Sequence, residues 1–154
     1  MTPNLDESHN AVWRLFLTTQ ALLLDRIEQE LAEAELPPLT WYDVLWALES
    51  SPDRHLRLHE LAEAIVLNRS NLTRLIDRLE AAGLVCRKSC PQDRRGAFAA
   101  ITEEGLAMRQ RMWQVYGVAI AKYFANYVSD AEVVVLSQVL IRIREGMRDE
   151  GSTG

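Results

Sequence analysis

The chain has 154 residues, of which 48% are hydrophobic and 25% charged, and its formal net charge is −5 at pH 7. This length suffices for one domain with a real hydrophobic core, and the absence of a long uninterrupted apolar run excludes a membrane span. The first ten residues have neither a basic start nor an apolar segment, and the chain holds two cysteines. We therefore expect a cytoplasmic protein without a secretion signal or a disulfide scaffold.

A long helix is predicted from about Asp6 to Leu36, because apolar side chains recur at helical spacing without an interrupting glycine or proline. They cover more of the circumference than a surface helix needs, which predicts burial against more than one partner. Two prolines follow Leu36 and end the helix. A second helix is predicted after them, with Thr40 as its N-cap and Asp43 as the partner in a capping box.

The stretch from Leu56 to Ile101 predicts a short strand over residues 56–58, two helices joined by a tight turn, and a two-stranded hairpin. Asn68 is predicted to cap the second of these helices, and Gly83 to end it in a left-handed conformation. Apolar residues recur on one stripe of this helix. The stripe comprises Leu72, Leu75, Ile76 and Leu79.

The opposite face of the second helix carries side chains that can read DNA. Asn and Arg make bidentate contacts to adenine and guanine edges in the major groove, whereas Ser and Thr suit phosphates. The alternative is an ordinary amphipathic surface helix with a solvated polar face. The candidate contacts in and just before this helix are Asn68, Arg69, Ser70, Asn71, Thr73, Arg74 and Arg78.

The hairpin carries a basic tip. Its central residues favour a turn, and an arginine at such a tip can reach the minor groove, whose negative potential attracts it. Asp93 can pair with one of the arginines and fix its pose. A merely solvated hairpin is the alternative, but it does not explain why the basic tip directly follows the reading helix. The candidate contacts in the hairpin are Arg87, Lys88, Asp93, Arg94 and Arg95.

The distribution of charge matters more than the net negative value. Residues 54–95 hold nine basic and five acidic side chains, whereas the rest of the chain holds eight basic and seventeen acidic ones. The positive charge is therefore concentrated in the helices and hairpin described above. The acidic remainder would repel DNA that approaches from the wrong side.

Two further helices are predicted after the hairpin. Thr102 caps a long one that reaches about Tyr127, and Ser129 marks the break before a last helix over residues 131–148. We expect residues 151–154 to form a disordered tail. One small lobe cannot cover the apolar faces of the first and the last two helices, which predicts pairing with a second chain.

Short motifs follow one another in fixed order over residues 58–105: Glu60-Leu61-Ala62, Asn71-Leu72-Thr73-Arg74, Arg78-Leu79-Glu80, Gly83-Leu84-Val85, Asp93-Arg94-Arg95 and Thr102-Glu103-Glu104-Gly105. Their order and spacing resemble the winged helix-turn-helix core of the MarR family of bacterial transcriptional regulators. No single motif is specific, but the set is.

The resemblance implies a mainly α fold with a small β-wing. A winged helix-turn-helix lobe would span residues 39–101, and the N-terminal helix (1–36) and the C-terminal helices (102–150) would form an intertwined dimerisation region. We expect a homodimer that places two reading helices about one DNA turn apart on a pseudo-palindromic operator. Such a protein would be a transcriptional regulator, which we expect to be a repressor. Its partners would be double-stranded DNA and a second copy of itself, with no membrane and no cofactor.

Proteins of this family often bind a small aromatic or phenolic ligand in a cleft between the dimerisation helices and the winged lobe. The resemblance therefore implies release from DNA by such an effector, and aromatic walls suit aromatic ligands. The alternative is ordinary core packing of aromatic side chains. The candidate pocket residues are Trp13, Trp41, Trp46, Trp113 and Tyr116.

Other chemistry has weaker support in the sequence. Cys86 and Cys90 would form a thiol switch only if they are exposed and their pKa is lowered by basic neighbours. His55 and His59 lack the partners that complete a zinc site, so we expect no metal. The sequence has neither a phosphate-binding glycine loop nor a nucleophile elbow, so we expect no enzyme. A winged-helix protein that binds another protein is the competing hypothesis, and it would not need the polar face of the second helix.

Overall fold

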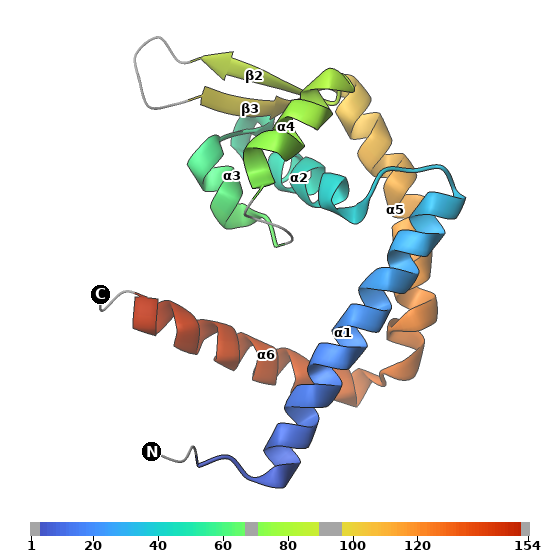
Figure 1. Cartoon of the computed structure of the whole chain (residues 1–154), viewed down its shortest axis with the longest axis vertical. Coiled ribbons are helices and arrows are strands. Elements are labelled where there is room, and N and C mark those ends of the chain that lie inside the picture. The colour runs from blue at the N-terminus through green and yellow to red at the C-terminus, as the bar shows by residue number, and fades with distance from the viewer. Residues whose placement is uncertain (1–3, 67–70, 90–96, 152–154) are drawn as a thin grey trace. The chain divides into compact units, whose positions relative to one another are not determined.

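The computed structural model describes residues 4–66, 71–89 and 97–151. The chain divides into two compact units, Met1–Val118 and Ala119–Gly154. Figure 1 labels the helices and strands along the chain. They are α1 (Glu7–Glu33), α2 (Leu39–Glu49), β1 (His55–Arg57), α3 (Leu58–Ala64), α4 (Leu72–Ala81), β2 (Val85–Ser89), β3 (Ala97–Ile101), α5 (Glu103–Tyr123) and α6 (Asp130–Gly151), with 3-10 turns η1 (Pro52–Arg54) and η3 (Ala125–Tyr127).

The predicted fold class, mainly helical with a small wing, is confirmed. The three strands form one antiparallel sheet in the order β1-β3-β2, so the last strand in the sequence lies in the centre. On β3, Ala99 is paired with Leu56 of β1 on one side and with Arg87 of β2 on the other. Helices α2 and α3 contact β3, and α4 contacts β2 (Figure 1). The small side chain of Ala99 is buried in the core between the helices and the sheet, which lets the helices approach the sheet closely.

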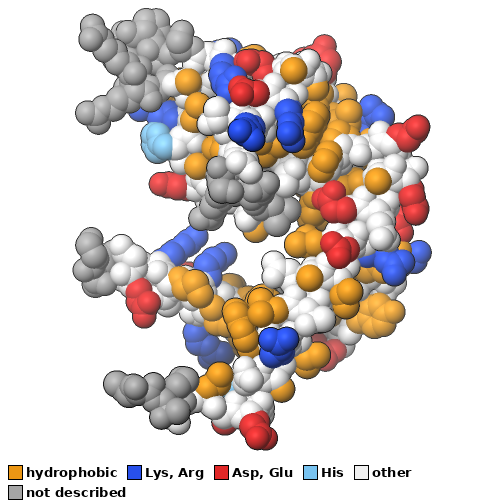
Figure 2. Space-filling model, in the orientation of Figure 1, with side chains coloured by type: hydrophobic (Ala, Val, Ile, Leu, Met, Phe, Trp, Pro, Cys, Tyr) orange, Lys and Arg blue, Asp and Glu red, His pale blue; other side chains and the backbone are white. Residues whose placement is uncertain are grey.

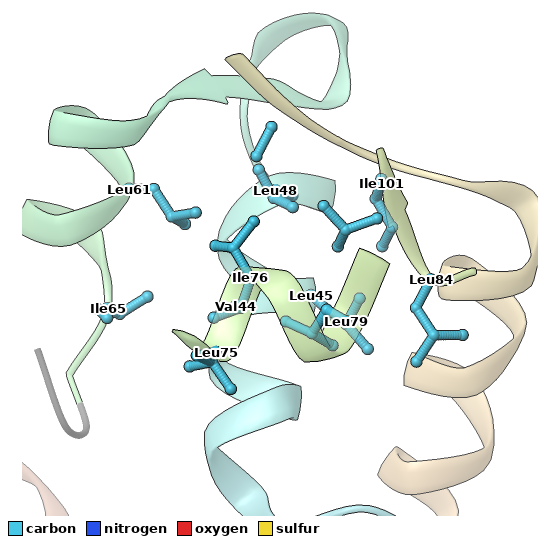
Figure 3. Close-up of a cluster of buried hydrophobic side chains, with 12 residues drawn as sticks. Val44, Leu45, Leu48, Leu61, Ile65, Leu75, Ile76, Leu79, Leu84 and Ile101 are labelled. Carbon is cyan, nitrogen blue, oxygen red and sulfur yellow. The ribbon is translucent and has the colours of Figure 1, made fainter. Parts of the chain in front are cut away.

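The core of the first unit lies between α2, α3, α4 and the sheet (Figure 3). The stripe predicted for α4 is confirmed, since Leu75, Ile76 and Leu79 are buried and Leu72 packs against them. Each buried side chain of this size contributes about 1.5–3 kcal/mol to folding. The other members of the cluster are Val44, Leu45, Leu48, Leu61, Ile65, Leu84, Val85, Ala99 and Ile101.

Thr102 joins the hairpin to α5, as the predicted N-cap. Its hydroxyl donates to the carbonyl oxygen of Gly83 at 2.7 Å and accepts from the backbone N–H of Gly105 at 3.0 Å. Its own backbone N–H donates to the carbonyl oxygen of Leu84 at 3.1 Å. Gly83 has a φ of 78°, which confirms the left-handed residue predicted after α4. The end of α4, the base of the hairpin and the start of α5 are thus held at one point.

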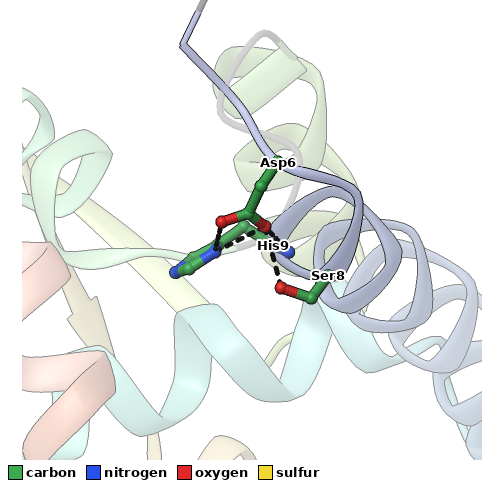
Figure 4. Close-up of polar contacts among 3 residues, drawn as sticks. All are labelled: Asp6, Ser8 and His9. Carbon is green, nitrogen blue, oxygen red and sulfur yellow. Dashed lines mark hydrogen bonds and ion pairs between the residues drawn. The ribbon is translucent and has the colours of Figure 1, made fainter.

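Asp6 caps α1 at its N-terminus (Figure 4). Its carboxylate accepts hydrogen bonds from the backbone N–H of His9 and the hydroxyl of Ser8, both at 2.8 Å. The bonds from His9, the backbone one first, lower the pKa of Asp6. The helix ends at Glu33, three residues before the predicted end, and Glu35 takes a positive φ of 58°. This left-handed residue turns the chain before the two prolines are reached.

Both terminal helices expose apolar side chains. Ile27 and Leu31 are the buried residues of α1, and α6 has none. Figure 2 shows hydrophobic side chains exposed over α6. Among the described residues no single helix is long and apolar enough to cross a membrane, and only α5 with η3 and α6, taken as a bent pair, meet the length and composition criteria. The exposed apolar residues include Val12, Trp13, Leu15 and Phe16 of α1 and Val133, Leu136, Leu140, Ile143 and Met147 of α6.

The predicted cap of α2 is wrong. The helix begins at Leu39 after Pro38, without a side-chain cap from its own segment, and Thr40 lies inside it. The backbone N–H of Leu39 instead donates to Oε1 of Glu28 on α1 at 2.7 Å. Asp43 accepts from the backbone N–H of Val66 at 2.7 Å in place of closing a capping box. Both carboxylate contacts bridge segments far apart in sequence, so local patterning could not reveal them.

Other boundaries differ by a few residues. The first strand starts at His55, and Leu58 already begins α3. Helix α5 ends at Tyr123 and is followed by a 3-10 turn. The predicted recapping by Ser129 is confirmed, because its hydroxyl accepts from the N–H of Glu132 at 3.2 Å and its N–H donates to that side chain at 3.0 Å. Helix α6 includes Gly151, which we placed in the tail; residues 152–154 lie outside the described structure.

Replacing Gly105 should destabilise the first unit. A methyl group at this position would overlap the carbonyl oxygen of Leu84 and lie 2.7 Å from Cγ1 of Ile101. We expect Gly105→Ala to lower the free energy of unfolding by about 2–3 kcal/mol, measured by urea denaturation. Gly146→Ala is the matched control, because a methyl group there meets nothing within 4 Å, and it should be neutral or stabilising. Equal effects of the two changes would contradict the close packing at Gly105.

Candidate nucleic-acid interface

Helix α4 exposes the polar face that the sequence predicts for DNA. Because its apolar stripe is buried in the core, Asn71, Thr73, Arg74 and Arg78 are all exposed. Figure 2 shows Lys and Arg side chains, with acidic ones among them, over α4 and β2. The predicted contacts before the helix lie outside the described residues: Asn68, Arg69 and Ser70.

Arg74 and Arg78 line a pocket of about 140 Å³ between α4 and the start of α2. The structure therefore brings these two arginines and Asn71 to one side of α4, as the sequence predicts. The guanidinium groups of Arg74 and Arg78 and the hydroxyl of Thr40 offer hydrogen-bond donors of the kind that bind phosphate oxygens. Sequence reasoning did not connect α2 with this face, since the approach of the two helices is a tertiary contact. The remaining lining residues are Pro38, Thr40, Trp41 and Leu75.

Arg87 on β2 is held by carboxylates of α4. Its guanidinium lies 2.7 Å from Oδ1 of Asp77 and 3.2 Å from Oε1 of Glu80, and it donates to the carbonyl oxygen of Thr73 at 3.4 Å. The backbone N–H of Arg87 donates to Oε2 of Glu80 at 2.9 Å. The hydrogen bond with Asp77 is the main cause that raises the pKa of Arg87. Sequence reasoning missed this pairing, although acidic residues three apart on one helix share a face.

The rest of the predicted wing contacts are only partly described. Lys88 is exposed on β2, next to the held Arg87. Asp93, Arg94 and Arg95 lie outside the described residues. The two hairpin strands pair in register from Val85 with Ile101 to Ser89 with Ala97, so the hairpin extends away from the core with Lys88 near its outer end.

An aromatic cluster joins α2 to α5. The ring of Tyr42 lies 4.9 Å from that of Tyr116 and 6.2 Å from that of Trp113, and the last two are 5.8 Å apart. Burial, followed by the nearby Tyr42 and Asp43, raises the pKa of Tyr116. A tyrosine is protonated at neutral pH in any case, and this shift is in the direction that favours the protonated form. Sequence reasoning found Trp113 and Tyr116 but missed Tyr42, which is 8% exposed and reads as a core residue of α2.

The other three predicted pocket residues have different neighbours. Trp13 is half exposed and contacts Phe16 on its own helix, with ring centres 6.2 Å apart. Trp41 packs against the core and lines the pocket beside α4. Trp46 is 50% exposed and lies 5.6 Å from the guanidinium of Arg109. The structure thus groups Trp113 and Tyr116 but places Trp13, Trp41 and Trp46 elsewhere.

Arg109 of α5 forms an ion pair with Glu49 at the end of α2. The Arg109 side chain is 13% exposed and the Glu49 side chain 21%, so this pair is largely shielded from water. The guanidinium also lies over the ring of Trp46, which adds a cation–π contact. Helices α2 and α5 are therefore joined by charge as well as by aromatic packing.

The residues weighed for metal or thiol chemistry are only partly described. Within residues 4–66, 71–89 and 97–151, no three His, Cys, Asp or Glu side chains are placed to hold a metal ion. The ring of His55 packs edge-on against Phe98, with centres 5.1 Å apart. Cys86 is a half-buried free cysteine, and Cys90 lies outside the described residues.

Comparison with known proteins finds one family. Residues 36–96 match the model of the MarR family. The chain is 29% identical over 119 residues to the HTH-type transcriptional regulator MhqR of Bacillus subtilis (strain 168), which is 77% of this chain and 79% of MhqR. AbsC, a MarR family transcriptional regulator from Streptomyces coelicolor, has a TM-score of 0.85 at 30% identity, over 96% of this chain and 99% of AbsC. Sco3205, a MarR family transcriptional regulator of that organism solved in complex with DNA, has a TM-score of 0.86 at 30% identity, over 95% of this chain and 91% of Sco3205.

Removing the charge of Glu49 should destabilise the protein, because the largely buried guanidinium of Arg109 would lose its ionic partner. We expect Glu49→Gln to lower the free energy of unfolding by about 1–3 kcal/mol in urea denaturation. Glu60→Gln is the control, since Glu60 pairs with Arg57 at 3.9 Å with both side chains at least 40% exposed. That change should cost less than about 1 kcal/mol. A loss no larger for Glu49→Gln than for the control would contradict the role of the shielded pair.

Proposed function

Because the chain belongs to the MarR family of transcriptional regulators, we propose that it binds double-stranded DNA sequence-specifically as a homodimer. The observation that carries this proposal is the exposed face of α4, where Arg74 and Arg78 stand opposite a fully packed apolar stripe. A helix whose apolar face is buried in the core can enter the major groove with its exposed polar face. The DNA complex of the related Sco3205 supports the same activity here.

In this proposal α4 is the recognition helix. Arg74 and Arg78 read guanine edges, Asn71 reads adenine, and Thr73 contacts a phosphate. Residues 68–70, directly before the helix, add further contacts. In the wing, Lys88, Arg94 and Arg95 approach the minor groove, and Asp93 holds one of the two arginines in place.

The homodimer follows from the apolar surfaces of α1 and α6. Side chains such as Val12 and Phe16 of α1, and Leu140 and Ile143 of α6, are about half exposed or more in the single chain. A second copy supplies the apolar surface that they need, and homodimers are typical of the family. Two-fold symmetry then pairs two recognition helices with a pseudo-palindromic operator. We propose that the bound dimer acts as a repressor in the cytoplasm.

A small aromatic effector would act through the cluster of Tyr42, Trp113 and Tyr116. Ligand response is typical of the family, and these rings combine an apolar surface with hydroxyl donors. Tyr42 belongs to α2, whose buried side chains Leu45 and Leu48 pack in the same core as α4. A ligand that displaces the Tyr42 ring would therefore shift the recognition helix. We centre the ligand site on this cluster and no longer include Trp13, Trp41 and Trp46, which have other neighbours.

DNA binding is tested by fluorescence anisotropy with a duplex from the intergenic region upstream of the coding sequence and a scrambled duplex, at several salt concentrations. The protein should prefer the first duplex, with affinity that falls steeply as salt rises. Arg74→Ala should cost about 1–3 kcal/mol and relax specificity at one position in each half-site. Arg95→Ala should weaken binding with less effect on sequence choice. Arg148→Ala, at the end of α6, is the control and should bind like the wild type.

If the upstream duplex gives no preference, selection from a random DNA pool separates two outcomes. Enrichment of a pseudo-palindrome means that the operator lies elsewhere, and it supports the proposal. Equal weak binding throughout, unaffected by Arg74→Ala, would contradict sequence-specific binding and favour the protein-interaction module.

The effector site is tested with 4-hydroxybenzoate and related single-ring phenols. Binding should quench tryptophan fluorescence and release the protein from its duplex. Tyr116→Phe keeps the ring but removes the hydroxyl donor, so it should weaken ligand binding by about 1 kcal/mol or roughly fivefold. Tyr127→Phe, whose ring is 81% exposed, is the control. Ligand-driven release that is unchanged in Tyr116→Phe would place the effector site elsewhere.

A further inference from the structure

Arg87 attaches the hairpin to α4 through its side chain and its backbone. The contacts given above reach Thr73, Asp77 and Glu80, which follow one another at spacings of four and three residues. Residues at these spacings line one face of a helix over two turns. A single arginine therefore fixes β2 along the length of α4 rather than at one point.

The place of Arg87 on β2 explains why a polar link is needed there. Side chains alternate along a strand, so Val85 and Arg87 face α4 while Lys88 faces away. Val85 is 2% exposed in the core, whereas the Arg87 side chain is 28% exposed where the core ends. Because β2 is an edge strand of the sheet, nothing on its outer side holds it by strand pairing within the described chain. Ion pairs to α4 supply that restraint.

The same contacts change the electrostatics of the recognition helix. Asp77 and Glu80 lie on the helix that carries Arg74 and Arg78, and two free carboxylates there would repel DNA phosphates. Arg87 pairs with both of them. Its guanidinium could reach a phosphate only by giving up at least one of these partners, which would leave a carboxylate uncompensated beside DNA.

We propose that Arg87 is a positioning residue for DNA recognition, which fixes the wing relative to α4 and partly offsets the negative charge of Asp77 and Glu80 without contacting a phosphate. This proposal rests on the DNA-binding function proposed above. It replaces the direct DNA contact that the sequence suggests for Arg87. Lys88, exposed on the other side of the strand, stays the direct wing contact.

The variant Asp77→Asn separates the two roles by the sign of its effect. If Arg87 contacts a phosphate, this change removes a negative charge near DNA and frees the arginine, so affinity for the operator should rise. If Arg87 is a positioning residue, the same change loosens the wing, so affinity should fall. Arg87→Lys adds a second contrast, because lysine keeps the charge but cannot bridge two carboxylates in fixed geometry. We expect both variants to weaken operator binding.

The salt dependence of binding gives an independent readout. Each lost phosphate contact lowers the slope of log affinity against log salt by about 0.9, so a dimer that loses two should change by roughly 1.8. We expect Arg87→Ala to weaken specific binding about tenfold, to lower the ratio of specific to non-specific affinity, and to leave this slope within about 0.5 of wild type. Lys88→Ala is the matched control and should reduce the slope.

These measurements use the full-length dimer and the duplex that the wild type prefers. A slope reduced by roughly 1.8 in Arg87→Ala, or tighter binding by Asp77→Asn with an unchanged ratio of specific to non-specific affinity, would overturn the positioning role. The positioning role would also be overturned if Arg87→Ala had the same ratio of specific to non-specific affinity as the wild type. Partial unfolding alone would reduce the fraction of active protein but leave this ratio unchanged. If the wild type shows no sequence preference at all, the DNA-binding function fails, which is a separate outcome from any result on Arg87.

Discussion

The burial of one face of α4 against α2 and the sheet determines how the whole candidate interface is presented. A ten-residue helix is marginal in water by itself, so α4 depends on this packing for its existence as well as its orientation. Leu75, Ile76 and Leu79 fix its rotation about the helix axis. The exposed positions of Arg74 and Arg78 are the geometric consequence, because they lie on the opposite side.

The interactions that hold the hairpin and α5 in place differ with their distance from this core. Apolar contacts hold Val85 at the base of the hairpin, a backbone-centred junction at Thr102 holds the start of α5, and ion pairs hold Arg87 further out. Each suits its surroundings, because hydrophobic burial weakens where water has access and charged hydrogen bonds still operate there. The hairpin can therefore extend beyond the core and keep a defined relation to α4.

The same helix α2 that supports α4 also carries Tyr42 and Glu49, which face α5. The aromatic cluster and the ion pair with Arg109 therefore contact the helix that packs in the same core as α4. Packed cores shift between discrete arrangements more readily than they deform. In the proposed function, α2 is the element that links the effector site to α4.

Local sequence patterns predicted the order of the elements, the buried stripe of α4, the left-handed Gly83 and the capping roles of Thr102 and Ser129. These features depend on local periodicity and on backbone geometry within a few residues, which a sequence displays directly. Three contacts became evident only in the folded chain: Glu28 accepts from the start of α2, Tyr42 completes the aromatic cluster, and Arg87 pairs with α4. Those contacts join residues from separate elements, and a side chain's partner there depends on how the elements pack, which no local pattern records.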